Sequence, residues 1–347
     1  MKNNTMEEST ITKTKQKEQN LIALAIVLGG LFAGSLFVDF VQLFSGSGFS
    51  QHVIKNTSIL ETNGRTWVAY DEPKVTLEVI SDKDCLTCNT EEAVTWIKRL
   101  VPTASVVAVD TQSTSGTEHI QAFDIQSLPA FVFDEKIKET GFYQETKDLF
   151  TPSQKHFSFA MGKIGFTGGK FFHPPTPEAN DIVLGNPDAP VKIVVYTDFE
   201  CQYCYEFHTH LKEIAKEYAD KVSITYRHLP LSFHKQAPLA ALASQCAYAQ
   251  NKFPEYSDSL FREQGTWGKT TGTTWFTNQA RTLGLNSKEF TTCMTGKKYA
   301  EKIANDTFSA QEFGITGAPS TFVNTTLLSG AVDYDTLKRV IEQSLQK

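Results

Sequence analysis

The sequence has few cysteines, no cluster of basic residues and no disordered composition. Only six of its 347 residues are cysteine, too few for a small domain held together mainly by disulfides. Lys and Arg number 33 against 39 Asp and Glu, for a net charge of −6, and this mildly acidic balance argues against nucleic acid as the main partner. Hydrophobic residues make up 40% of the chain, which is enough to form cores. The length suggests about two domains.

Four of the six cysteines form two C-x-x-C pairs, Cys85 with Cys88 and Cys201 with Cys204. Such a pair can bind metal, carry redox chemistry or close a small structural loop. A zinc site of four cysteines needs both pairs to converge, yet 116 positions separate Cys85 from Cys201 (201 minus 85). This separation argues against a shared zinc site, so redox chemistry and a structural disulfide stay open for each pair, and we expect neither a metal nor a cofactor.

One long apolar run lies near the N-terminus. Leu21 to Val38 contains no charged residue, and the apolar character resumes after Asp39 as far as Phe44. A helix over 21–44 is about 36 Å long at ~1.5 Å per residue, and a bilayer core is about 30 Å thick. We therefore predict one transmembrane anchor, of the signal-anchor type, at 21–44. A cleaved signal peptide is the alternative, although its apolar region is usually shorter.

The distribution of lysines orients this anchor. Residues 1–20 hold four lysines, whereas residues 45–65 hold only Lys55 and Arg65. The positive-inside rule therefore places residues 1–20 in the cytoplasm and the rest of the chain outside a cell membrane, which we expect to be bacterial. That compartment permits disulfides.

Composition divides the exported part into four segments: a tether at 45–65, a first module at 66–165, a linker at 166–180 and a second module at 181–347. Paired glycines and the stretch HPPTP mark the linker. Each module has a strand, the pattern [ST]-D-x-[DE]-C-x-x-C and then an amphipathic helix, which we expect at 86–101 and 202–218.

A proline precedes a later strand in each module, Pro129 in the first and Pro319 in the second. The distance from the first cysteine of the pair is 44 positions to Pro129 and 118 positions to Pro319. The second module therefore carries an insert, which has helical composition from about 237 to 310.

The position of a cysteine in a C-x-x-C predicts its role. The first cysteine opens a helix, where unpaired N–H groups and the helix dipole favour a thiolate. We therefore predict that Cys201 is the attacking thiol and that Cys204 resolves the mixed disulfide. Cys85 and Cys88 take the same two roles in the first module.

Other polar residues near these motifs receive structural interpretations. Glu200 and Asp84, which precede the two pairs, are interpreted as solvated helix-capping acids. His208, His228 and His234 are interpreted as packing or surface histidines rather than acid–base catalysts.

Together these features resemble the thioredoxin fold, present twice. The second module resembles the DsbA-like branch, in which a helical domain is inserted into that fold. The first module is a looser match, which rests on CLTC, its strand and the Leu128-Pro129 segment. Gln202 and Leu86 stand where many relatives have proline. The matching segments of the second module are DIVLGNPDAPVKIVVYTDFECQYCYEF (181–207), YRHLPL (226–231), AALASQCAYAQNKFPEYSDSLF (240–261) and GITGAPSTFVN (314–324).

The resemblance implies an α/β chain with two tandem thioredoxin-like folds, the second with a helical insertion, behind one transmembrane helix. It also implies that Pro129 and Pro319 are the cis-prolines of these folds, placed beside the cysteines. Cys246 and Cys293 then form a structural disulfide that staples the insert.

The implied function is that of a membrane-anchored thiol-disulfide oxidoreductase, most simply a dithiol oxidase acting on exported proteins through Cys201 and Cys204. Its expected partners are those exported proteins and a quinone-linked membrane redox protein, without nucleic acid. Two alternatives stay open: a disulfide reductase or isomerase, and a tethered thioredoxin-fold binding module without catalysis.

Overall fold

The computed structural model describes residues 57–62, 65–70 and 72–346. The predicted cytoplasmic segment and transmembrane anchor lie outside these residues. Along the described ranges, no helix combines the length and apolar character needed to cross a bilayer. The chain packs as two compact units, of which the larger comprises 76–95, 105–135 and the residues from 147 onward. Both C-x-x-C segments lie in this larger unit.

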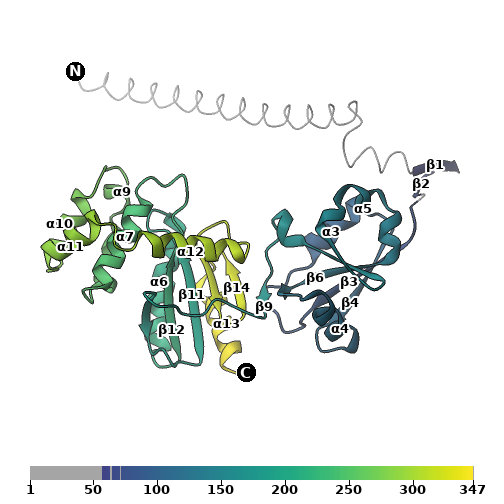
Figure 1. The fold of residues 1–347 in the computed structure, drawn as a ribbon. Helices are drawn as coiled ribbons and strands as arrows, with labels where there is room; N and C mark the ends of the chain where they lie inside the picture. The colour runs from purple at the N-terminus through teal and green to yellow at the C-terminus, as the bar shows by residue number, and fades with distance from the viewer. Residues whose placement is uncertain (1–56, 63–64, 71, 347) are drawn as a thin grey trace, which may run out of the picture. The chain divides into compact units, whose positions relative to one another are not determined.

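The second module is built on a mixed sheet (Figure 1). Its central pair, β11 and β12, runs parallel over the full length of both strands, and β13 pairs antiparallel with the other edge of β11. Every residue of β12 and nearly all of β11 are buried, as expected for strands of a sheet that is covered on both faces. In spatial order the strands are β10 (Ile182–Gly185), β12 (Val222–His228), β11 (Val191–Thr197), β13 (Ser320–Val323) and β14 (Thr326–Ser329).

Helix α6 (Gln202–Glu217) connects the two parallel strands. Its buried side chains recur at helical spacing: Cys204, Phe207, His208, Leu211 and Ile214. This amphipathic face joins the main apolar core together with residues of the sheet. The second cysteine of the pair is therefore part of the core.

A run of helices separates β12 from β13 and gathers at one end of this sheet in Figure 1. It contains the fully buried Trp267, whose indole N–H donates to the carbonyl of Leu260 at 2.7 Å. The helices are α7 (Ala237–Tyr248), α8 (Phe253–Arg262), α9 (Gln264–Trp267), α10 (Thr274–Thr282), α11 (Ser287–Thr295) and α12 (Ala300–Glu312), and α13 (Tyr334–Leu345) follows β14.

A second sheet underlies the first module. Its strand β3 (Val75–Ser81) alternates buried and half-buried residues as far as Val79, and the central strand β6 (Ala130–Asp134) pairs with it antiparallel. The remaining strands, in spatial order β4-β3-β6-β8-β7, are β4 (Ala104–Asp110), β8 (His156–Phe159) and β7 (Phe150–Ser153). Helices of this region are α3 (Glu91–Leu100), α4 (Thr114–Phe123) and α5 (Gly141–Thr146), with 3₁₀ turns at Glu135–Glu139, Lys147–Leu149 and Met161–Ile164.

The short strand β9 (Lys170–Phe171) falls inside the range that we predicted as a linker. It pairs antiparallel with β14 on one side and with β5 (Ser127–Leu128) on the other. The peptide N–H of Phe171 donates to the carbonyl of Thr325 at 2.8 Å. The segment therefore has ordered backbone partners.

The smaller unit comprises the described residues as far as Val75 together with 96–104 and 136–146. It contains an antiparallel hairpin of β1 (Thr57–Thr62) and β2 (Arg65–Tyr70), and β1 falls within the predicted tether. Trp96 meets Phe142 edge to face at 6.3 Å between ring centroids. The alternation of strands and helices in the described chain confirms the α/β class.

A buried ion network lies next to β12. The guanidinium of Arg227, almost fully buried, contacts the carboxylates of Asp181 at 3.1 Å and Glu178 at 2.8 Å. Asp306 lies 3.9 Å from the same guanidinium and accepts the backbone N–H of His228 at 3.0 Å. Removing one member of such a network leaves an uncompensated buried charge, which is strongly destabilising.

Candidate active site

The Cys201–Cys204 pair lies at the junction of β11 and α6. Cys201 is the N-cap of α6, with extended backbone angles, and Cys204 lies one turn inside the helix. Before them, the N–H of Glu200 donates to Asp198 Oδ1 at 2.7 Å and the N–H of Cys201 donates to the Asp198 carbonyl at 3.2 Å. This Asx turn directs the chain from strand to helix. The expected helix at 202–218 agrees with α6 within one residue.

Both thiols are reduced in this structure, and both are largely buried: 6% of Cys201 and 1% of Cys204 are exposed. Pro319 lies beside them, as the peptide bond from Ala318 to Pro319 is cis and Cys201 Sγ lies 3.5 Å from the carbonyl oxygen of Ala318. A hollow of about 270 Å³ runs along 314–320 next to this proline. Extended polypeptide can pair with exposed backbone of this kind.

The two thiols have opposite acidities. The hydrogen bond from the Cys204 thiol, assisted by the backbone N–H groups of Cys204 and Tyr203, lowers the pKa of Cys201 to about 6, against the opposing effects of burial and of the Asp198 charge. Burial first, and then its interaction with Cys201, raises the pKa of Cys204 above the usual range. At neutral pH, Cys201 is therefore the thiolate and Cys204 the proton donor that stabilises it.

Asp198 is a buried acidic residue next to the thiols, and we predicted no role for it from the sequence. Its side chain is buried, its Oδ2 accepts the N–H of Leu231 and Nδ1 of His234, each at 2.8 Å, and its own N–H donates to Cys204 Sγ at 3.4 Å. The recurring Asp of the [ST]-D-x-[DE]-C pattern was the signal that could have identified it. His234 thus contacts the acid behind the cysteines, which its position in the sequence does not indicate.

The interpretation of Glu200 as a solvated helix cap is wrong. Its carboxylate accepts the backbone N–H of Gln236 at 2.8 Å, and α6 has no side-chain cap. The turn is secured instead by Gln264, whose amide donates to the carbonyls of Phe199 at 2.8 Å and Cys201 at 2.9 Å. Gln264 lies in the helical insert, so the insert directly holds the turn that carries the cysteines.

In the first module, Cys85 and Cys88 form a disulfide. The preceding turn repeats that of the second module, because the N–H of Asp84 donates to Asp82 Oδ1 at 2.8 Å and the N–H of Cys85 to the Asp82 carbonyl at 3.0 Å. The helix expected at 86–101 begins only at Glu91, however. Cys85 therefore has no helix N-terminus to stabilise its thiolate, and Asp84 caps no helix.

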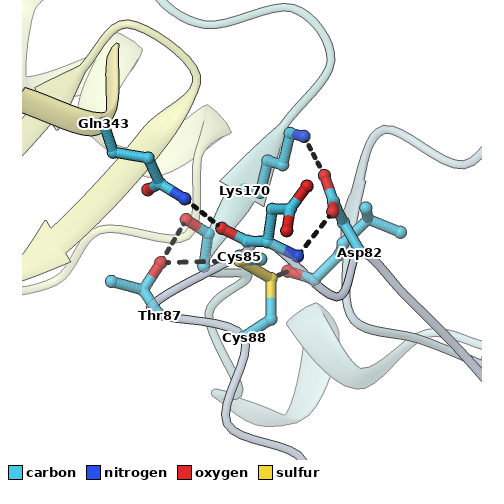
Figure 2. The surroundings of a disulfide bond; sticks show 9 residues. Asp82, Cys85, Thr87, Cys88, Lys170 and Gln343 are labelled. Atoms are coloured by element: carbon cyan, nitrogen blue, oxygen red, sulfur yellow. Dashed lines mark hydrogen bonds and ion pairs between the residues drawn. A yellow bond between two sulfur atoms is a disulfide. The ribbon is translucent and has the colours of Figure 1, made fainter. Parts of the chain in front are cut away.

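Figure 2 shows the surroundings of this disulfide. Lys170 forms an ion pair with Asp82, and Gln343 donates to the carbonyl of Asp84 at 2.6 Å. The hydroxyl of Thr87 donates to the carbonyl of Gly169 at 2.7 Å. A methyl group on Gly169 would lie 2.4 Å from the Thr87 carbonyl, so only glycine permits this close approach. Residues before the C-x-x-C loop and within it thus have polar partners.

Pro129 lies beside this disulfide, as Pro319 lies beside the Cys201–Cys204 pair. The Leu128–Pro129 peptide bond is cis, and Cys88 Sγ lies 3.5 Å from the carbonyl oxygen of Leu128. In this module it is the second cysteine, not the first, that approaches that carbonyl. A cavity of about 350 Å³ opens beside Pro129, and Thr87, Phe131 and Phe166 contribute to its lining.

The helical insert holds the remaining two cysteines. Cys246 on α7 and Cys293 on α11 form a disulfide with a sequence separation of 47. Of the other histidines considered, His208 contacts Asp258 at 2.8 Å. His228 is fully buried, and burial lowers its pKa to about 3, so that it is neutral.

Aromatic side chains are exposed on the surface of the second module. Tyr203, between the two cysteines, is 65% exposed, and Phe233, next to His234, is 72% exposed. Tyr205 instead stacks on Phe261 and is partly buried. The rings of Tyr203 and Phe233 are therefore open to solvent.

Comparison with known proteins places these features in a family. The model of a thioredoxin family matches residues 178–343. Probable disulfide bond formation protein D of Bacillus cereus is 30% identical over 175 residues, which cover 47% of this chain and 78% of that protein. The Na(+)/H(+) antiporter NhaA of Herminiimonas arsenicoxydans is 30% identical over 171 residues, but the match spans 49% of this chain and only 27% of the antiporter.

Two solved structures give similar matches. The oxidised form of BdbD from Bacillus subtilis has 24% identity and a TM-score of 0.46, and the match covers 53% of this chain and 99% of that one. Alpha-DsbA1 of Wolbachia pipientis has 26% identity and a TM-score of 0.45, and the match covers 49% of this chain and 93% of that one.

Proposed function

Because this chain belongs to the DsbA-like thiol-disulfide oxidoreductases of the thioredoxin fold, we propose that it is a membrane-anchored dithiol oxidase that forms disulfides in exported proteins. The reacting pair is Cys201 and Cys204. The observation that carries the proposal is the placement of Cys201, a low-pKa thiol at the start of α6 beside the carbonyl that precedes Pro319.

The proposed reaction begins from the Cys201–Cys204 disulfide. A client thiolate attacks Cys201 Sγ, and the bond between the two enzyme sulfurs breaks as Cys204 leaves and takes up a proton. A second client thiolate then attacks the client sulfur of the mixed disulfide and releases Cys201 as a thiolate. The client loses two electrons and the enzyme gains them. The low pKa of Cys201 favours this direction, because it stabilises the reduced enzyme and makes Cys201 the better leaving group.

The client binds as an extended segment beside Pro319, with apolar side chains against the exposed rings of Tyr203 and Phe233. The hollow along 314–320 supports this placement. The alternatives are a disulfide reductase or isomerase and a binding module without catalysis. A static binding module does not require a stabilised thiolate, so the asymmetry between the two thiols favours an enzyme.

The apolar run at 21–44 supports a single-pass anchor, and the lysines of residues 1–20 support an exported position for the modules. The reduced enzyme must pass its two electrons on. A quinone-linked membrane redox protein is the acceptor that fits an anchored oxidase.

The first module is proposed as a second, more divergent thioredoxin-like fold, and its disulfide as a relay between Cys201–Cys204 and the membrane partner. The matching Asx turn and the carbonyl of Leu128 beside Cys88 support the relay. A Cys85→Ala/Cys88→Ala double variant should leave single-turnover oxidation by Cys201–Cys204 intact but slow its reoxidation in cells. Unchanged reoxidation would leave the first pair with a structural role.

Trapping of clients tests the enzymatic proposal. In a Cys204→Ala variant the Cys201 thiolate can still attack a client disulfide, one client sulfur leaves as a thiolate, and no Cys204 remains to release the resulting mixed disulfide, so client proteins should accumulate on Cys201 and separate under reducing conditions. A Cys201→Ala/Cys204→Ala variant is the control, since it retains the fold without either thiol. The oxidoreductase proposal fails if the single variant captures no more protein than the double variant.

A further inference from the structure

Three side chains of metal-binding type converge on the sheet of the first module, and none of them is a cysteine. They are Glu78 of β3, His119 of α4 and His156 of β8. Their ligand atoms all lie within 4.8 Å of one another. In sequence the three are 41 and 37 positions apart, which matches no metal-binding spacing, and the sequence analysis predicted no metal.

The register of the sheet explains the convergence. Glu78 pairs with Val132 of β6, and His156 pairs with Asp134 two residues further along the same strand. Alternate residues of a strand point to the same face, so Glu78, Val132 and His156 share one face of the sheet. Ile120 of α4 packs on the cluster that contains Val132, which brings the neighbouring His119 over this face.

An ion pair between His119 and Glu78 explains why these two side chains lie together, but it does not explain the position of His156. His119 Nε2 lies 2.5 Å from Glu78 Oε2, and the two side chains are 9% and 24% exposed. The His156 ring meets the His119 ring edge-on at 4.8 Å between centroids. Among the residues that the structure describes, no hydrogen bond to either ring nitrogen of His156 is found. A second imidazole without a partner thus faces a Glu–His pair.

We propose that Glu78, His119 and His156 bind one Zn²⁺ ion. Two imidazole nitrogens and one carboxylate oxygen form a donor set that zinc prefers, with bonds of about 2.0–2.2 Å. Ligand atoms around a tetrahedral zinc ion lie about 3.3 Å apart. Binding therefore moves His119 Nε2 and Glu78 Oε2 slightly apart and draws His156 inward, and two bonds to the ion replace the hydrogen bond between them.

The fourth coordination position of the proposed zinc ion faces solvent. A cavity of about 460 Å³ is lined by both histidines together with Ser153 and Gln154. Water can therefore complete the tetrahedron, and the ion has a path of entry. Bound zinc joins β3, α4 and the β7–β8 hairpin at one point, so it stabilises the first module independently of Cys85 and Cys88.

The test measures zinc binding to the full chain with every cysteine pair oxidised, because free thiolates would also bind the metal. Zn²⁺ is titrated in competition with a chromophoric chelator, and Co²⁺ reports tetrahedral geometry through its visible absorption. His156→Gln is the decisive variant, since this side chain is half-buried and its loss should not unfold the sheet. His173→Gln, at an exposed histidine outside the cluster, is the matched control.

We expect one zinc ion per chain, unchanged affinity in His173→Gln and a loss of at least about 100-fold in His156→Gln, since even removing an outer-shell partner costs about 10–100-fold. Zinc should also raise the unfolding temperature of the parent chain but not that of His156→Gln. Equal affinities in the two variants, or no stoichiometric zinc binding by the parent chain, would overturn the proposal and leave a simple Glu78–His119 ion pair.

Discussion

The acidity of Cys201 depends first on the thiol of Cys204, and this dependence can be tested by substitution. With a pKa of about 6, Cys201 is about 90% thiolate at pH 7, whereas a free thiol of pKa about 8.5 is about 3% thiolate. Cys204→Ala removes the largest stabilising interaction. The burial of Cys201 and the charge of Asp198 then act unopposed by that hydrogen bond, so the pKa of Cys201 rises and the thiolate fraction at pH 7 falls, by up to about 30-fold.

The assay is the rate of alkylation of Cys201 by iodoacetamide as a function of pH, with the other cysteine pairs oxidised. In the parent chain the rate should rise with pH through a midpoint near 6. Cys204→Ser is the matched control, because its hydroxyl can still donate to the thiolate, and its midpoint should lie between those of the parent and Cys204→Ala. Identical midpoints in the parent chain and Cys204→Ala would refute the assigned cause of the low pKa.

Three further predictions concern the scaffold. Each gives an expected change in the free energy of unfolding, which urea unfolding measures. Gln264→Ala removes two hydrogen bonds to carbonyls of the turn before α6 and should destabilise the chain by about 1–3 kcal/mol; a change below the error of the measurement would show that the insert does not hold this turn. Arg227→Ala should cost about 3–5 kcal/mol because it leaves the two buried carboxylates of Asp181 and Asp306 with the single cation of Lys302, against about 0–1 kcal/mol for Arg262→Ala at an exposed ion pair. Similar losses in both variants would contradict the network. Replacing Cys246 and Cys293 by serine should cost about 4 kcal/mol by the chain-entropy model, and equal stability with and without this bond would contradict a stapling role.

Much of the second module could be predicted from its sequence, because its signals are local. The apolar run of β11, the cysteines one turn apart and the helical spacing of Phe207 and Leu211 all lie within a few residues of one another. The range of α6 followed from that pattern to within one residue. The α/β class followed in the same way.

The contacts that tune the site are not local, and sequence reasoning missed them. Asp198 meets His234 across 36 positions, and Gln264 reaches Cys201 across 63. Glu200 was assigned to the helix end beside it, but its carboxylate binds a backbone N–H that is also 36 positions away. Such partners depend on how the insert packs, and no spacing rule encodes that.

The first module departed from expectation for a local reason. We placed a helix directly after Cys85 by analogy with the second module, but Asn89 and Thr90 intervene before α3 begins at Glu91. The N–H of Glu91 is bonded to the Asn89 side chain at 3.0 Å, as expected of a residue type that favours turns and helix starts over helix interiors. The pattern before the cysteines was conserved between modules, whereas the residues after them set where the helix starts.

The reduction potential of the Cys201–Cys204 pair tests the central claim most directly. The protein is equilibrated with glutathione buffers of graded potential, and the fraction oxidised at Cys201 is read by alkylation and mass spectrometry, with a Cys85→Ala/Cys88→Ala variant used to isolate the pair. A dithiol oxidase with a stabilised Cys201 thiolate should have a potential well above the value of about −270 mV that is typical of thioredoxin. A potential at or below about −270 mV would contradict the account and indicate a reductase.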